Sequence, residues 1–231
     1  MSIPSLADNL RRVQETVAAA SARSGRTPDA VKILGATKTV TPERIREAAA
    51  LGLRYVGENR VQEREAKRAA LDDLEFEWHL LGPLQSNKAA KAVQLFHCVE
   101  TVDSIALVQR LARIAVAPLP VMLEINIGRE PQKHGVTPED APALAAAVCG
   151  SPSLQLRGIM AVPPAGAVAE AARPYFAALA ILSDDLRRAC GKPPGVWDLS
   201  MGMSQDFAVA IEEGSTLVRL GTALFGSRTH P

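Results

Sequence analysis

Hydrophobic and polar positions follow a pattern that repeats along the chain. A short apolar run is followed by a polar or capping turn and then by a stretch with helical spacing, and each unit spans about 25 to 30 residues, the size of a βα unit. The apolar runs predict eight strands. They lie at residues 31–36, 53–59, 76–82, 95–101, 120–128, 154–162, 195–202 and 216–226.

The stretches between these runs predict helices. Apolar residues at helical spacing predict a leading helix that ends near Ser24-Gly25; they are Leu6, Leu10, Val13 and Val17. Later helices include a charged one over residues 61–71 and an Ala-rich one that follows Pro163-Pro164 and continues through Leu186. Caps at the helix starts are predicted at Thr41, at Asp103 or Ser104, at Thr137 and at Ser204.

Eight strands that alternate with helices favour a closed α/β architecture. We predict a (β/α)8 TIM barrel with an extra N-terminal helix, forming a single domain over residues 1–231, because no linker-like gap interrupts the pattern. A doubly wound open sheet is the structural alternative. It is disfavoured by the eight units and by the lack of a glycine-rich dinucleotide turn after the first strand.

Composition narrows the classes of function. A formal net charge of +1 and 4% aromatic residues argue against nucleic-acid binding, which needs a basic surface or a stacking platform. No apolar run approaches a bilayer span, and no secretory signal is visible at the start. The odd number and wide spacing of Cys98, Cys149 and Cys190 disfavour a disulfide framework, and no zinc-binding pattern occurs. We expect a cytoplasmic protein without a metal.

Lys38 lies where the first strand passes into a helix that starts at Thr41-Pro42. On this stretch alone a solvated loop cation is the favoured interpretation, because lysines are mostly exposed. The alternative is an amine that has lost water and can condense with an aldehyde. In a barrel the first and eighth strands are neighbours, and alternation puts Arg219 on the interior face. Two cations would then share one mouth, which is costly without an anion between them.

The loops after the seventh and eighth strands are where barrels often bind phosphate. They read SMGMSQDF (200–207) and RLGTALFG (219–226). Gly202 and Gly221 allow close backbone approach, and Ser204 and Thr222 add hydroxyl donors. An ordinary turn would explain SMGMS alone, but together with Lys38 these loops suggest a site for a phosphorylated aldehyde.

Several motifs carry a resemblance that covers nearly the whole chain. GATKTVTPE, YVGENRVQE, WHLLGPLQSNK, RGIMAV, LSMGMSQDFAVAI and VRLGTALFG look like those of the YggS/PROSC family of pyridoxal 5'-phosphate homeostasis proteins, related in fold to the barrel of alanine racemases. The resemblance implies that Lys38 forms an aldimine with pyridoxal phosphate (PLP) and that Arg219 faces the pyridine nitrogen. It further implies that the phosphate is held by Ser204, Gly221 and Thr222, and that the pocket is lined by Asn59, Ser200 and Met201.

Three functions compete at this stage. The leading hypothesis is a binding protein that buffers PLP inside the cell and delivers it to apo-enzymes, working as a monomer and without assigned catalytic residues. A PLP-dependent, racemase-like enzyme is the alternative, although an arginine beside the ring nitrogen weakens the electron sink. Racemisation also needs a second acid/base, but Tyr55, early in the second strand, is expected to pack, and Tyr175, in the Ala-rich helix, is expected to lie on the outer layer. A sugar-phosphate enzyme that uses Lys38 is the third. His79 is interpreted as a satisfied core histidine.

Overall fold

A computed structural model describes residues 4–164 and 169–226 of the chain, and it contains one closed barrel of parallel strands. The strands follow one another around the barrel in sequence order, and β8 pairs with β1. Their bounds are β1 Lys32–Ala36, β2 Tyr55–Glu58, β3 Glu77–Leu80, β4 Cys98–Val102, β5 Leu119–Glu124, β6 Leu154–Met160, β7 Asp198–Met203 and β8 Leu217–Leu220. The predicted (β/α)8 barrel is confirmed.

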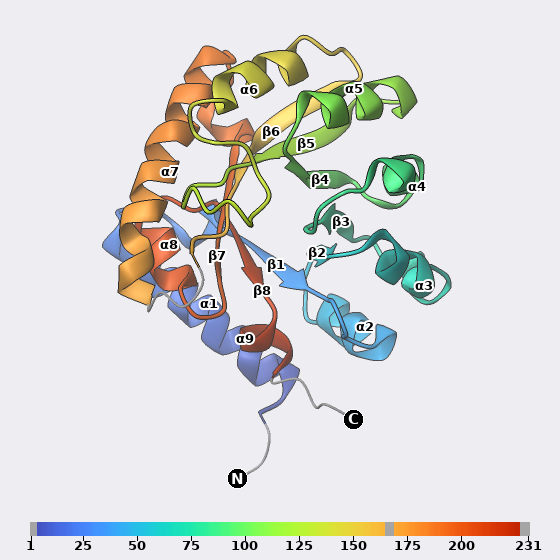
Figure 1. Cartoon of the computed structure of the whole chain (residues 1–231). Coiled ribbons are helices and arrows are strands. Elements are labelled where there is room, and N and C mark those ends of the chain that lie inside the picture. The colour runs from blue at the N-terminus through green and yellow to red at the C-terminus, as the bar shows by residue number, and fades with distance from the viewer. Residues whose placement is uncertain (1–3, 165–168, 227–231) are drawn as a thin grey trace.

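Helices lie outside the ring of strands (Figure 1). Their bounds are α1 Leu6–Arg23, α2 Pro42–Ala50, α3 Val61–Leu71, α4 Ala89–Leu95, α5 Ile105–Ile114, α6 Ala141–Cys149, α7 Ala169–Ala189, α8 Phe207–Glu212 and α9 Thr222–Phe225. Three short 3-10 turns occur at Pro28–Ala30, Ser86–Lys88 and Pro194–Val196. None of the described helices combines the length and apolarity that a bilayer span requires.

Local capping explains where several helices begin. Ser5 and Asp8 form a capping box at the start of α1, so the leading helix begins at Leu6. Thr41 accepts a hydrogen bond from the Arg44 N–H at the start of α2. Ser104 caps α5 through the Leu107 N–H. These caps confirm the predicted starts at Thr41 and Ser104.

Two predicted helix starts are wrong. Thr137 exchanges hydrogen bonds with Asp140, which closes a turn, and α6 begins only at Ala141. Ser204 does not cap α8, which begins at Phe207, and its hydroxyl instead accepts a hydrogen bond from the Ala223 N–H in the first turn of α9. Thr137 makes the expected contact with the N–H three residues on, but in a turn that precedes α6, whereas the Ser204 hydroxyl has a different partner from the one that local spacing suggested.

Several predicted strands are longer than the observed ones. The run 216–226 divides into β8 and the short helix α9, and the run 195–202 begins with a 3-10 turn before β7. The run 120–128 continues past β5 into a loop that makes one isolated bridge, Ile125 with Val136. The apolar runs continue past β5 and β8 because Ile125 and Leu224 are also buried in the core, whereas Val196, before β7, is exposed. The Ala-rich helix is confirmed from Ala169, and residues 165–168 lie outside the described part.

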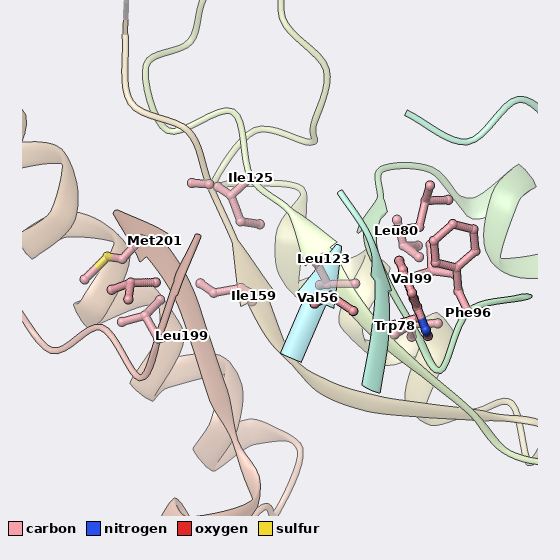
Figure 2. Packing of buried hydrophobic residues seen from close by; sticks show 14 of the residues in the cluster. Val56, Trp78, Leu80, Phe96, Val99, Leu123, Ile125, Ile159, Leu199 and Met201 are labelled. Atoms are coloured by element: carbon pink, nitrogen blue, oxygen red, sulfur yellow. The ribbon is translucent and has the colours of Figure 1, made fainter. Parts of the chain in front are cut away.

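The hydrophobic core lies mainly between the strands and the surrounding helices. Val218 and Leu220 of β8 face this layer, as alternation predicted, and Figure 2 shows Trp78 and Leu80 of β3 in it. The opposite strand faces point into the barrel, where Arg219 lies. Its interior is therefore partly polar, whereas barrel interiors are dominated by branched apolar residues.

Candidate ligand site at the carboxyl end of the barrel

A braced turn carries Lys38 directly after β1. The Thr37 N–H donates to Gly57 O at 2.9 Å, and the Thr37 hydroxyl donates to Glu58 Oε1 at 2.7 Å. Lys67 of α3 donates to both Thr37 O and Glu58 Oε1, at 2.8 and 2.6 Å. Thr39 then adopts a positive φ of 65°. The residues on both sides of Lys38 are thus held, so its backbone position at the rim is defined.

The Lys38 side chain is half-buried, and its amine makes no hydrogen bond or ion pair with another described residue. Lys67, by contrast, is fully engaged with Glu58 and Thr37. A ligand at the rim could therefore reach the Lys38 amine without displacing a partner among the described residues.

Arg219 lies inside the barrel beside the same rim. Its Cα pairs with Leu34 of β1, so the expected proximity of the first and eighth strands is confirmed. Its Nη1 donates to Ser200 Oγ at 2.6 Å and its Nη2 to Ala161 O at 3.0 Å. Burial lowers the pKa of Arg219, and the carboxylate of Glu100 opposes that effect. The other guanidinium N–H groups have no described protein partner.

The loops after β7 and β8 contact each other at the rim. Ser204 Oγ accepts a hydrogen bond from the Ala223 N–H at 3.1 Å. Gly221 precedes α9, and a Cβ placed on it would have its nearest neighbour, Ala36 O, at 3.8 Å, so its open side is free of described atoms. Thr222 is exposed at the start of α9. The structure therefore brings Ser204, Gly221 and Thr222 together.

Gly202 has a structural reason to be glycine. Its φ is +94°, and a Cβ there would lie 2.6 Å from the Cβ of Ala210 and 3.0 Å from the Cα of Phe207. The close contact at this glycine is made by helix α8, and the expected approach of a phosphate to it stays a prediction.

The remaining predicted pocket residues occupy three different environments. Asn59 is half-buried directly after β2. Ser200 is fully buried inside the barrel. Met201 points the other way, into the core beside Leu199 (Figure 2). A ligand at the rim would therefore meet the main chain of Met201 rather than its thioether.

Charged residues inside the barrel form a continuous hydrogen-bonded series, which we call the interior chain. It comprises, in order, Lys32, Asp198, Arg157, Glu77, His79, Glu100, Ser200 and Arg219. Glu77 and Arg157 also line a cavity of about 620 Å³ at the amino end of the barrel. The interior chain therefore connects that cavity with the rim that carries Arg219.

His79 is the ionisable centre of the interior chain. Its Nδ1 lies 2.5 Å from Glu100 and its Nε2 lies 3.2 Å from Glu77. Burial by itself would lower the pKa of His79, but the two carboxylates outweigh burial and raise it to about 9. Hydrogen bonding to His79 in turn lowers the pKa of Glu77 to about 2. Positive and negative side chains therefore alternate along the interior chain at neutral pH, with the uncharged Ser200 between Glu100 and Arg219.

Sequence analysis missed most of the interior chain. It interpreted His79 correctly as a satisfied buried histidine, but it identified neither Glu77 nor Glu100 as its partners. A signal was present, because charged residues at alternate positions of a buried strand share the face opposite its apolar residues. Glu77 and His79 flank the outward-facing Trp78 in this way.

Glu124, the last residue of β5, adds a carboxyl group whose Oε2 is buried without a described partner. Burial, together with the nearby charge of Asp103, raises the pKa of Glu124 to about 7, and Arg219 and His134 oppose the shift. The group is therefore partly protonated near neutral pH. Among the described residues, no cluster of three or more metal-ligating side chains occurs.

Both tyrosines lie away from the rim loops. Tyr55 begins β2 at the amino end, where the Lys32 amine lies 5.7 Å from its ring centroid and the His79 ring packs edge-on at 6.2 Å. Tyr175 lies on helix α7, outside the barrel. The expectation that Tyr55 packs is confirmed.

Known proteins resemble this chain over nearly its full length. The family described as alanine racemase, N-terminal domain, matches residues 2–229. The pyridoxal phosphate homeostasis protein of Pseudomonas aeruginosa is 43% identical, and the match covers 97% of this chain and 96% of that protein. The protein of the same name from Aquifex aeolicus is 42% identical, with 96% and 98% covered.

Solved structures agree with the sequence matches. PipY of Synechococcus elongatus, in a structure with PLP bound, is 36% identical with a TM-score of 0.82, and the match covers 96% of this chain and all of that one. Alanine racemase from Corynebacterium glutamicum shares the fold at 15% identity, with a TM-score of 0.68 over 96% of this chain and 62% of the racemase. With a closed barrel, a matching family domain and full-length relatives, the chain belongs to the pyridoxal phosphate homeostasis protein family.

Proposed function

We propose that this chain binds PLP at the carboxyl end of its barrel and takes part in intracellular PLP homeostasis. The observation that carries the proposal is the presence of two cations at one rim. The half-buried Lys38 amine has no described partner, and the buried Arg219 has guanidinium N–H groups that donate to no described residue. The homologous PipY structure with PLP bound supports this assignment.

The residues at the rim fit the chemistry of the proposed ligand. PLP supplies an aldehyde that condenses with a primary amine and releases water, and it carries a phosphate that needs several hydrogen-bond donors. Lys38 is the candidate amine. The open side of Gly221 and the hydroxyls of Ser204 and Thr222 are the candidate phosphate contacts.

Each remaining predicted residue has a role consistent with its position. Arg219 would direct a guanidinium N–H to the pyridine nitrogen, and an arginine does not readily give up a proton, so that nitrogen would stay unprotonated. Asn59 and the main chain of Met201 would line the pocket, and Ser200 would support Arg219. This arrangement favours holding the ligand over activating it for carbanion chemistry.

Replacement of Lys38 tests the proposed attachment site. We expect freshly purified protein to be yellow, and Lys38→Ala to lose the covalent chromophore while keeping the fold, because only the reacting amine is removed. Absorbance spectra before and after borohydride reduction, with mass mapping of the reduced label, are the measurement. Lys88→Ala is the matched control, since Lys88 is also a half-buried lysine that follows a strand of the same barrel. Unchanged colour in Lys38→Ala would contradict the assignment.

A second measurement separates a carrier from an enzyme. We propose that the bound PLP passes to apo-enzymes, and transfer to a purified apo-enzyme with recovery of its activity is the test. Turnover of D- or L-amino acids at about 1 per second or faster would instead favour a racemase-like enzyme. The position of Tyr55 at the amino end of the barrel supports the carrier role. A monomeric state and a cytoplasmic location stay predictions from the sequence.

A further inference from the structure

The rim end of the interior chain consists of Glu100, Ser200 and Arg219. Glu100 is fully buried, and both of its oxygens are used: Oε1 contacts His79 Nδ1 at 2.5 Å, and Oε2 accepts from Ser200 Oγ at 2.6 Å. The carboxylate therefore cannot rotate without breaking one of two short contacts. Its position is set by β3 on one side and by β7 on the other.

The Ser200 hydroxyl transmits this orientation to Arg219. A hydroxyl has a single proton to donate, and here the proton goes to Glu100, so the oxygen lone pairs face the guanidinium. Arg219 Nη1 donates to that oxygen at 2.6 Å, and Nη2 donates to Ala161 O at 3.0 Å. Two anchors on separate nitrogens restrict rotation of the guanidinium plane.

Stability alone gives a poor account of this arrangement. A buried ion pair is often no more stabilising than well-packed apolar residues of the same volume, and barrel interiors are usually filled with branched apolar residues. Glu100 and Arg219 are nevertheless 0% and 6% exposed. Burial of both charges is easier to understand if the carboxylate compensates Arg219 and orients it for a ligand.

We propose that Glu100, held by His79, is a positioning residue for Arg219 and acts through the Ser200 hydroxyl. It sets the direction in which the free guanidinium N–H groups meet the ring nitrogen of the ligand. This inference rests on the proposed PLP binding and deepens it.

Two replacements test the connection. Glu100→Gln removes the charge at nearly constant shape, and Ser200→Ala removes the hydroxyl that links it to Arg219. Each is expected to raise the Kd for PLP about tenfold, as for loss of one hydrogen bond to a charged group. Each is also expected to shift the absorption maximum of the bound ligand. The double variant should bind no more weakly than Ser200→Ala, because the two residues act in series, and Ser200→Thr, which keeps the hydroxyl, should restore binding.

Glu77→Gln is the matched control, since Glu77 contacts the other nitrogen of His79 and touches neither Ser200 nor Arg219. Like Glu100→Gln, it removes the charge of a carboxylate that contacts His79, but it should change the Kd for PLP less than about threefold. A wild-type Kd and spectrum in Glu100→Gln would overturn the proposal. So would losses that multiply in the double variant, or a Glu77→Gln effect as large as that of Glu100→Gln.

A measurement without ligand separates this inference from the proposed function. Rotation of the Arg219 guanidinium, followed by side-chain nitrogen NMR, should be slow in the ligand-free protein. It should become faster in Glu100→Gln and Ser200→Ala but not in Lys38→Ala. If PLP does not bind but the rotation rates differ as expected, only the proposed function is contradicted. Equal rotation rates in all variants would contradict the positioning role. If Glu100→Gln does not fold, Ser200→Ala and Ser200→Thr provide the same comparison.

Discussion

His79 shows how a few contacts decide the charge of a single residue. Its ring is almost completely buried, which favours the neutral form, yet each ring nitrogen faces a carboxylate, Glu100 on one side and Glu77 on the other. The carboxylates prevail and raise the pKa of His79 to about 9. At neutral pH the imidazolium donates from both nitrogens, which keeps both carboxylates ionised inside the barrel.

This shift predicts a pH dependence of stability. Because the folded-state pKa of His79 lies above its ordinary value of 6.5, its contribution is fully present below about pH 6.5 and is lost as the pH rises through 9. The loss should be on the order of 3 kcal/mol of unfolding free energy. Urea unfolding across this range is the measurement. His79→Gln should remove this part of the slope, whereas His134→Gln, at an exposed histidine, should retain it.

At the scale of elements, the packing of α8 against the end of β7 depends on Gly202. The positive φ of +94° and the 2.6 Å approach to the Ala210 Cβ act together there. Gly52 separates the two effects, since its φ is +91° and nothing lies within 4 Å of the place where a Cβ would be. The pair therefore offers similar backbone conformations with and without a steric neighbour.

We predict that Gly202→Ala is markedly more destabilising than Gly52→Ala. Gly52→Ala should cost about 1 to 2 kcal/mol from backbone strain alone. Gly202→Ala should cost about 1 to 3 kcal/mol more, because helix α8 must shift to accept the methyl group. Urea denaturation midpoints give the comparison. Equal losses of stability in the two variants would show that α8 shifts to accept the methyl group without a loss of stability. Packing would then not be the reason for glycine at position 202.

On the scale of the whole molecule, closure of the barrel brings the first helix, α1, against the last two helices, α8 and α9. Helix α1 packs on α8 and α9, and Asn9 donates to Leu224 O at 3.0 Å. Arg26, just after α1, donates to the carbonyls of Ile211 at 2.6 Å and Ser215 at 3.0 Å, around the connection from α8 to β8. The extra N-terminal helix thus covers the seam where β8 meets β1 (Figure 1).

Removal of the Arg26 contacts should weaken the whole barrel. Arg26→Ala removes charged hydrogen-bond donors from the carbonyls of Ile211 and Ser215, of which Ile211 O keeps the Gly214 N–H, and we expect a loss of about 2 to 3 kcal/mol. Arg11→Ala removes an exposed pair with Asp8 on the same helix and should change stability by less than about 1 kcal/mol. Global unfolding in urea, followed by circular dichroism, compares them. A loss in Arg26→Ala as small as that in Arg11→Ala would contradict the role of this seam.

Much of the fold could be predicted because it depends on short-range pattern. Alternating strand and helix periods indicated the barrel, Thr41 and Ser104 marked helix starts through N–H groups three residues away, and alternation within β8 put Arg219 inside. Full-length resemblance then pointed to the rim residues. Predictions that needed a partner from another strand or loop failed more often, as with Ser204, whose hydroxyl meets Ala223.

The order of elements, the barrel and the rim where Lys38 emerges could be predicted from the sequence, because these follow from hydrophobic period and strand parity. Only the tertiary structure decided which charges meet inside. Glu100 receives hydrogen bonds from His79 and from Ser200, a hundred residues away in the chain, and the choice among possible partners depends on how the strands are staggered around the barrel. Stagger is a property of the closed sheet, since each strand's register depends on both neighbours and on the bulges between them.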